Sequence, residues 1–236
     1  MSSHRGPDLP YSVVAGVTPC GPSWLVASAK LAGSNFAPEK PKVYESFLDV
    51  LGERPSFAIV VINAPIGYLD TPDSGPRRCD VEARALLGRR GTSVHNAPSR
   101  AALDGVVGPG ANGLDAVTTT ILPKYQEVAA EMSPYRQRVV YEGHPELSFY
   151  QLHKNTPLKR SKKIEAGREE RREVLADRIR GSENHLDADL IGVPEKHLFD
   201  AFALLWTARR VFGHAALRIP KEPVWDSEGL RMEIVY

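Results

Sequence analysis

The chain has 236 residues, 42% of them hydrophobic and 25% charged, and its formal net charge is +1. This length suits one large globular core, and the near-zero charge excludes no class of partner, because a local basic patch can lie within a balanced total. Two cysteines are too few for a disulfide framework, and no apolar run approaches the roughly 20 residues that span a bilayer.

The first ten residues are polar and contain proline, which is unlike a signal peptide. We therefore expect a soluble, cytoplasmic protein with reduced cysteines and no membrane association. Residues 1–11 are expected to form a flexible N-terminal segment and residues 12–236 a single domain. The sequence sets no oligomeric state.

The first predicted element is an antiparallel hairpin over residues 12–30. The prediction comes from the segment "SVVAGVTPCGPSWLVASAKLAG" (12–33), in which two apolar runs flank a turn that contains proline and glycine. A short helix is predicted at 42–53. The β-branched run "FAIVVINAPIG" (57–67) is typical of a central strand buried on both faces.

Helices and loops dominate the middle of the chain. Residues 75–90 have a helical apolar stripe that ends before Gly91, with Asp80 and Arg84 spaced to form an ion pair. Residues 92–113 read as a loop with a short helix near 100–104. A helix over 113–132 is expected to kink or divide at Pro123.

The second half repeats the pattern of strand and helix. Residues 138–152 begin as a strand and become a helix at Pro145, while 162–181 form a charged surface helix. Residues 194–213 are apolar on most of their circumference, which predicts a core helix. The whole order predicts an α/β fold, a mixed sheet with helices on its faces, in which 57–63 and 138–142 join the hairpin.

Candidate site residues cluster where strands end. "YEGHPE" brings Glu142, His144 and Glu146 to the end of a strand, where open α/β sheets bind ligands. The alternative is that the three share one solvated strand face. Asp200 lies in the most apolar helix, where a carboxylate is costly unless it meets a cation or donor. Its alternative is an ion pair with Lys196 or His197.

Basic residues offer a second kind of site. Asn63 ends the central strand, and the following "RRCDVEAR" places arginines at a helix start, where they suit an anion. More distant basic residues can extend this rim: Lys124, Lys162, Arg168 and Arg171. The alternative is a set of solvated basic side chains. Ser93 and His95 have no acid at a spacing that predicts a hydrolase triad.

These segments together resemble the DUF429 family, a set of predicted nucleases with a ribonuclease H-like fold. The similarity runs from about residue 12 to the C-terminus, with the blocks in matching order. The blocks that carry it include "AGV…GPSWLVA", "VVINAPIGY", "RRCDVEARALLGRRGTSVHNAPSRAAL", "VYEGHPELSFYQL", "SKKIEAGREERREVL", "HLFDAFALLWTARR" and "EGLRMEIVY".

The resemblance implies acids that clamp two divalent ions about 3.5–4 Å apart. Glu142, Glu146 and Asp200 match those positions, and Glu142 and Asp200 are the implied metal ligands. Thr18 and Asn63 stand where the family typically has aspartates, in "G-V-D-G" and "I-D-I-P-I-G". We expect Mg²⁺ or Mn²⁺ to bind weakly for this reason, and the substitutions Thr18→Asp and Asn63→Asp to tighten that binding.

Three functions remain open. The first is a metal-dependent phosphodiesterase, a hydrolase of nucleic acid, with an impaired metal site. The second is a catalytically silent relative that binds nucleic acid or a phosphorylated or other anionic small molecule, with Thr18 and Asn63 in the site and cations at Arg78, Arg84 and Lys124. The third is a metal-independent hydrolase or transferase whose acid and base are Glu142, His144 and Glu146. In each, Thr18, Asn63, Glu142 and Asp200 are expected to face one crevice on one side of the sheet.

Overall fold

The centre of the protein is a six-stranded sheet. The computed structural model describes residues 9–106, 114–188, 190 and 192–236, so most of the expected N-terminal segment lies outside the described residues. The strand order is β3-β2-β1-β5-β6, and β4 pairs with β2 at residues 24–26, on the same edge of β2 as β3. The strands are β1 (Ser12–Cys20), β2 (Ser23–Ala32), β3 (Asn35–Pro38), β4 (Lys42–Tyr44), β5 (Ile59–Ile62) and β6 (Val140–Glu142).

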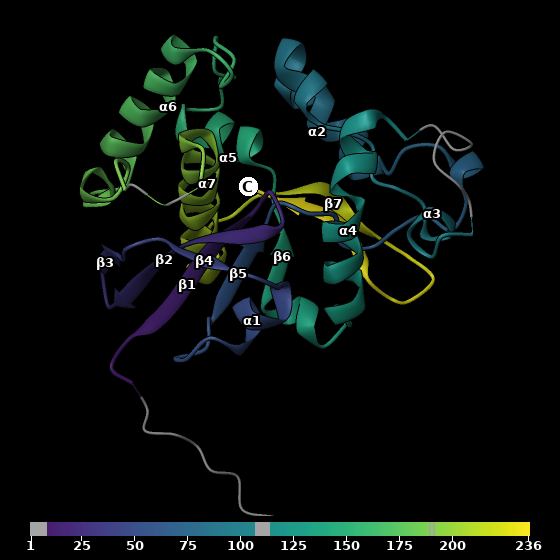
Figure 1. Ribbon diagram of the computed structural model, residues 1–236, viewed down its shortest axis with the longest axis horizontal. Coiled ribbons are helices and arrows are strands. Elements are labelled where there is room, and N and C mark those ends of the chain that lie inside the picture. The colour runs from purple at the N-terminus through teal and green to yellow at the C-terminus, as the bar shows by residue number, and fades with distance from the viewer. Residues whose placement is uncertain (1–8, 107–113, 189, 191) are drawn as a thin grey trace, which may run out of the picture.

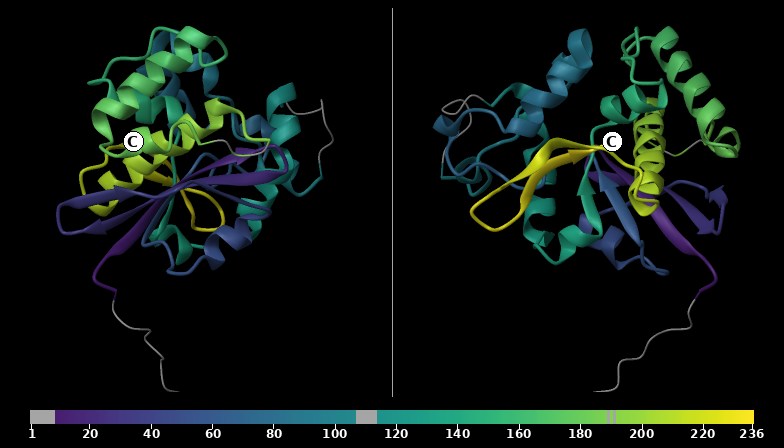
Figure 2. Two further views of the ribbon diagram at one scale, coloured as in Figure 1. Left: turned by 60° about the vertical axis from the view of Figure 1, so that its left-hand side comes forward. Right: turned by 180° about the vertical axis from the view of Figure 1, so that it is seen from behind.

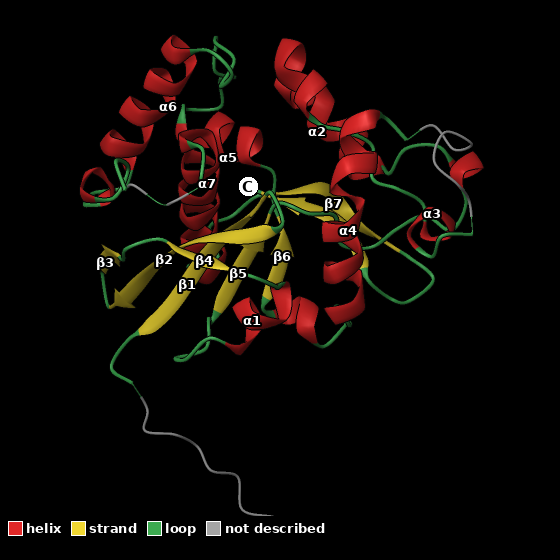
Figure 3. Ribbon diagram, viewed as in Figure 1, coloured by secondary structure: helices red, strands yellow, loops and turns green. Residues whose placement is uncertain are grey.

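The sheet has mixed strand directions. β1 is antiparallel to β2 and parallel to β5, and β5 is parallel to β6. The predicted hairpin and the strands predicted at 57–63 and 138–142 are therefore confirmed as parts of one sheet. Figure 3 shows the strands together in the middle of the molecule with helices around them. This is the expected α/β fold, a mixed sheet with helices on its faces.

Helices cover both faces of the sheet (Figures 1 and 2). One face carries α5 (Pro145–Leu152), α6 (Glu165–Arg178) and the predicted core helix α7 (Glu195–Phe212). The other face carries α1 (Phe47–Gly52) and α4 (Ala116–Glu131). α7 crosses β1 at Gly16, where an added Cβ would lie 2.1 Å from the backbone nitrogen of Leu205. Only glycine permits this approach.

A second layer completes one end of the molecule. It contains α2 (Arg78–Leu87), the short α3 (Arg100–Leu103), and the hairpin β7 (Arg218–Trp225) and β8 (Arg231–Val235). α2 packs on this hairpin through Cys79, Ala83, Leu87, Ile219 and Ile234. A bridge between Gly143 and Val235 joins β8 to the end of β6. Short 3₁₀ turns lie at Pro72–Ser74, Gly88–Ser93, Arg136–Arg138 and Ser182–Asn184.

Two predicted elements differ from the structure. Residues 42–53 form strand β4 and then α1, because a Ser46 and Asp49 capping box starts the helix late. α4 continues through Pro123, whose ring lies on the exposed side of the helix, where water can solvate the freed carbonyl. The short helix near 100–104 is confirmed, and residues 107–113 of the predicted loop lie outside the described residues. Among the described helices, none has both the length and the apolarity for a bilayer crossing.

Candidate functional site

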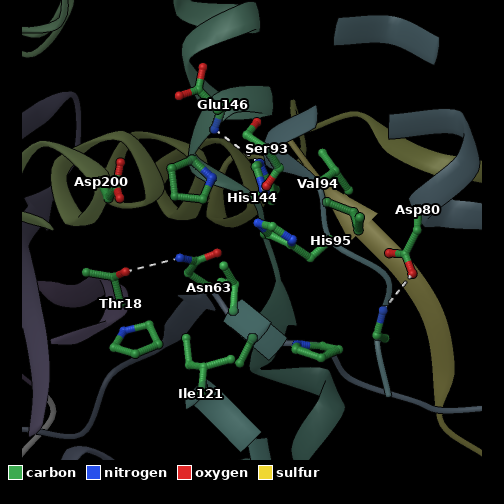
Figure 4. A pocket seen from close by; sticks show the side chains of 18 of the residues that line it. Thr18, Asn63, Asp80, Ser93, Val94, His95, Ile121, His144, Glu146 and Asp200 are labelled. Atoms are coloured by element: carbon green, nitrogen blue, oxygen red, sulfur yellow. Dashed lines mark hydrogen bonds between the residues drawn. The ribbon is translucent and has the colours of Figure 1, made fainter. Parts of the chain in front are cut away.

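A pocket of about 460 Å³ opens at the carboxyl ends of β1, β5 and β6. We call it the strand-end pocket. Its walls come from those strand ends, from α2, α4, α5 and α7, and from the segments before α6 and after α2. Figure 4 shows side chains that line it. Thr18, Asn63, Glu142 and Asp200, four residues far apart in sequence, all contribute to this lining.

The four side chains do not share one face of the sheet. Val17, Ile62 and Glu142 are paired across β1, β5 and β6, so their side chains leave the same face, the one that α4 covers. Thr18 and Asn63 follow one residue later and leave the opposite face, where α7 carries Asp200. The expectation of a single face was therefore wrong for Glu142.

The two residues that replace the expected aspartates contact each other. The Asn63 amide donates a hydrogen bond to the Thr18 hydroxyl at 3.2 Å, as the dashed line in Figure 4 shows. Both side chains are neutral at ordinary pH. This part of the pocket therefore offers polar groups without negative charge.

A buried arginine neutralises Glu142. Arg77 precedes α2 and is only 4% exposed, and its guanidinium donates to both Glu142 oxygens at 2.6 and 2.8 Å. The same guanidinium donates to both Asp80 oxygens at 2.7 and 3.1 Å. Burial raises the pKa of Glu142 above its usual range, and Arg77 opposes the rise. Two carboxylates thus share one fixed cation.

This arrangement does not fit a metal ion. Ligand atoms of Cys79, Asp80 and Glu142 lie within 4.8 Å of one another, a spacing that suits a cation. Arg77, however, already bonds both carboxylates, and burial raises the pKa of the Cys79 thiol, which keeps it protonated. A divalent ion at this group would have to displace a buried guanidinium that makes bidentate bonds on two sides.

Asp200 is paired with a lysine. The Lys162 ammonium, from the segment before α6, donates to Oδ2 of Asp200. The other oxygen, Oδ1, is buried and has no hydrogen-bond partner among the described residues. The alternative partners Lys196 and His197 do not bond to Asp200 in the described structure. Lys162, which the sequence analysis placed on a general basic rim, is therefore the cation beside this carboxylate.

Glu146 is held by two arginines. Its Oε1 accepts from Arg171 at 2.5 Å and from Arg90 at 3.0 Å, and all of its side chain but 2% is buried. Burial alone would raise the pKa of Glu146, but Arg171 and Arg90 lower it below its usual range. Such a carboxylate stays ionised and is paired with two cations, so it lacks the proton of a general acid and is a poor ligand for a metal ion.

His144 has both ring nitrogens engaged. Nδ1 accepts from the Glu146 backbone N–H at 3.2 Å and so caps α5, while Nε2 lies 3.2 Å from the Ser93 carbonyl and donates to it. Burial lowers the pKa of His144, which favours this neutral form. The geometry therefore gives His144 a structural part in the pocket wall, and the expected acid and base trio of Glu142, His144 and Glu146 is already satisfied internally.

The cations expected from the sequence lie elsewhere. Arg78 forms an exposed pair with Glu82, and Arg84 bonds the Val94 carbonyl rather than Asp80. Lys124 is buried against Trp24 and pairs with Glu127 at 2.5 Å. None of the three contributes to the pocket lining that the described residues form. The lining cations are Arg77, Arg90, Lys162 and Lys163.

The pocket is balanced in charge. Its four lining acids are Asp80, Glu142, Glu146 and Asp200, against the four lining cations, and the buried Arg171 adds another positive charge directly behind Glu146. A site that clamps two dications needs an excess of carboxylates. The described residues of this pocket provide no such excess.

Comparisons with known proteins identify the family of the chain. The solved structure of Thermus thermophilus RuvC is 14% identical in sequence to this chain, with a TM-score of 0.41. The match covers 86% of this chain and 97% of the RuvC chain. No curated protein matches the sequence. The family model described as "Protein of unknown function (DUF429)" matches residues 16–224, which is most of the chain. The chain therefore belongs to the DUF429 family.

Proposed function

We propose that the strand-end pocket binds a phosphate-bearing ligand, a nucleic acid strand or a nucleotide, and holds no pair of catalytic metal ions. One observation carries this proposal. Each lining carboxylate already bonds a basic side chain of the same chain: Arg77 for Asp80 and Glu142, Arg90 and Arg171 for Glu146, and Lys162 for Asp200.

The lining also suits such a ligand. The Lys162 side chain is 28% exposed and Arg90 is 18% exposed, so both can face a ligand while they keep their carboxylate partners. Lysine and arginine are the side chains that bind phosphate most strongly in proteins. Val117, Ile121 and Tyr125 form an apolar wall on the α4 side, which offers a surface for a base or sugar ring.

A second candidate is the hydrolysis of nucleic acid with one weakly held Mg²⁺ or Mn²⁺. The observation that favours it is Oδ1 of Asp200, a buried carboxylate oxygen without a partner among the described residues. One oxygen of one carboxylate, beside a lysine ammonium, is a poor site for a dication because the ammonium repels it. We therefore place this function second.

Ligand titration separates the two candidates. Wild-type protein is titrated in EDTA with a labelled single-stranded oligonucleotide and with a nucleoside monophosphate, by fluorescence anisotropy and calorimetry. The variant Lys162→Gln removes a cation and leaves Asp200 negative, so the affinity should fall by about tenfold or more, or about 1.4 kcal/mol. Lys221→Gln, an exposed lysine outside the pocket, should bind like wild type.

Two results would contradict the first candidate. One is binding of equal strength by the wild type and Lys162→Gln. The other is binding by the wild type that needs added Mn²⁺, which would favour the one-metal candidate instead.

A further inference from the structure

We propose that His95, positioned by Asp115, is a general base for the hydrolysis, without a metal ion, of a phosphate ester bound in the strand-end pocket. The inference rests on the proposed function, since the ligand of the pocket is its substrate. Neither residue belongs to the carboxylate set that the family resemblance implies. No acid stands at a triad spacing from His95, and Asp115 contacts it from a segment twenty positions away.

The two side chains form a fixed pair. Nδ1 of His95 lies 2.6 Å from Oδ2 of Asp115, and the other carboxylate oxygen accepts the Thr118 backbone N–H at 2.7 Å, which caps α4. An ionised carboxylate accepts only, so Nδ1 of His95 carries the proton. Nε2 then has a free lone pair, and it has no hydrogen-bond partner within the part of the chain that the structure describes. This is the arrangement that prepares a histidine to accept a proton.

The segment that carries His95 is anchored on both sides. Before it, the Ser93 carbonyl accepts from His144 and the Val94 carbonyl accepts from Arg84 at 3.1 Å. After it, the Ala97 backbone N–H donates to Asp80 at 3.3 Å, drawn as a dashed line in Figure 4. Asp80 is itself held by Arg77. The buried ion cluster of the pocket therefore fixes the backbone beside His95, as a catalytic side chain requires.

His95 is the pocket histidine best placed for this chemistry. His144 uses both ring nitrogens inside the protein. His197 also lines the pocket, but burial lowers its pKa and the described residues give it no carboxylate bond that would fix its tautomer. The His95 ring lies among the lining side chains in Figure 4, and its side chain is 37% exposed, so substrate and water can reach it.

The reaction is balanced with water as the only co-reactant. Nε2 of His95 takes a proton from a water molecule as the water oxygen forms a bond to phosphorus. The ester P–O bond on the opposite side breaks, the departing oxygen takes a proton from solvent water, and the imidazolium returns its proton to solvent, which gives an alcohol and a phosphate with one ester fewer. Asp115 stabilises the imidazolium, and Lys162 and Arg90, which line the same pocket, are the cations that would bind the phosphate charge.

The positioning by Asp115 is tested by the tautomer of His95. Long-range ¹H–¹⁵N NMR should show a proton on Nδ1 of His95 in the wild type. Asp115→Asn keeps a good cap for α4, but its amide N–H donates to Nδ1 and moves the ring proton to Nε2. Asp177→Asn, an exposed aspartate elsewhere, should leave the tautomer unchanged. A wild-type His95 protonated on Nε2 would overturn the proposal.

The chemistry is tested with an activated phosphodiester, bis(p-nitrophenyl) phosphate, in EDTA. The wild type should release p-nitrophenolate, and both His95→Gln and Asp115→Asn should lower kcat by about 10² or more. His214→Gln, an exposed histidine outside the pocket, should keep the wild-type rate. Equal rates in His95→Gln and wild type, or no turnover by the wild type in EDTA, overturn the proposal. If oligonucleotide binding in EDTA persists in that case, the proposed function stands and only the dyad fails.

Discussion

Arg77 and Arg78 are neighbours in sequence with opposite environments. Arg77 is buried between Glu142 and Asp80, whereas the Arg78 side chain is 59% exposed and pairs with Glu82 along one helix turn. A buried charge that loses its partner is expensive, while an exposed pair contributes little. The two positions therefore allow a matched comparison of the same residue type.

We predict that Arg77→Met lowers the free energy of unfolding by about 3–5 kcal/mol, because Glu142 and Asp80 lose their shared cation. Arg78→Met should change it by less than about 1 kcal/mol. Urea denaturation followed by circular dichroism measures both. The double variant Arg77→Met with Glu142→Gln should recover part of the loss, since one buried charge is removed. Equal unfolding midpoints for the two single variants would show that the buried cluster adds no stability.

The sequence predicted which kinds of side chain lie in the site, but it did not predict which side chains pair with one another. The "RRCD" segment predicted an arginine site, yet a shift of one position decides which arginine faces Glu142. Lys162 was visible as a basic residue, and its contact with Asp200 spans 38 positions, which no local pattern reports. Partners at long range depend on how the elements pack, so a single sequence predicts the types of group better than their pairing.

At the scale of elements, α5 begins at a titratable cap. The unprotonated Nδ1 of His144 accepts the Glu146 backbone N–H, and burial lowers the pKa of His144. The unfolded chain takes up the histidine proton near the usual pKa of about 6.5, before the folded protein does. The free energy of unfolding that this residue contributes is therefore complete above about pH 6.5 and is lost as the pH falls through the lower pKa of the folded state.

We predict that His144→Asn makes unfolding less sensitive to acid. Asparagine caps helices well and does not titrate, so it keeps the bond to α5 and removes the proton linkage. Urea midpoints of wild type and variant are measured from pH 7.5 down to pH 5, and the midpoint of the variant should fall less steeply over this range than that of the wild type. The wild type and the variant are compared with each other because the raised pKa of Glu142 changes the stability of both proteins with pH in the opposite direction to His144. Parallel pH curves for the two proteins would contradict this role of His144.

Elements with continuous apolar runs were predicted well, and elements that depend on packing were not. The runs of β1, β2, β5 and α7 match strands or a helix buried on nearly all sides. The sequence did not predict β7, because "RIPKEPVW" contains two prolines and three charged residues. The segment forms a strand through its antiparallel pairing with β8. Lys124 was expected in the site, but the register of α4 turns it toward Trp24 instead. Helical periodicity predicts a buried stripe and not the neighbour it meets.

At the scale of the whole molecule, the charge of the pocket is assembled from distant segments. Thr18 comes from β1, Asn63 follows β5, Arg77 precedes α2, Lys162 precedes α6 and Asp200 lies in α7. The absence of acids at Thr18 and Asn63 is one cause of the weak metal binding that we predict. The structure adds a second cause, because internal cations already neutralise the acids that are present.

We therefore predict that new acids alone are not enough for a metal site. In Thr18→Asp with Asn63→Asp, Lys162 remains beside Asp200 and pairs with the added carboxylates, so Mn²⁺ affinity should rise less than about tenfold. Adding Lys162→Gln leaves three carboxylates, at positions 18, 63 and 200, on the α7 face without an internal cation. Each carboxylate within a few ångströms of the Mn²⁺ ion then raises the affinity for the ion several-fold. Calorimetric titration with Mn²⁺ should then show a gain of about 10² or more over wild type. Lys163→Gln in place of Lys162→Gln is the matched control, since Lys163 lines the pocket without a carboxylate partner among the described residues. If the double aspartate variant binds Mn²⁺ as tightly with Lys162 present as without it, the lysine does not act as the counterion of this site.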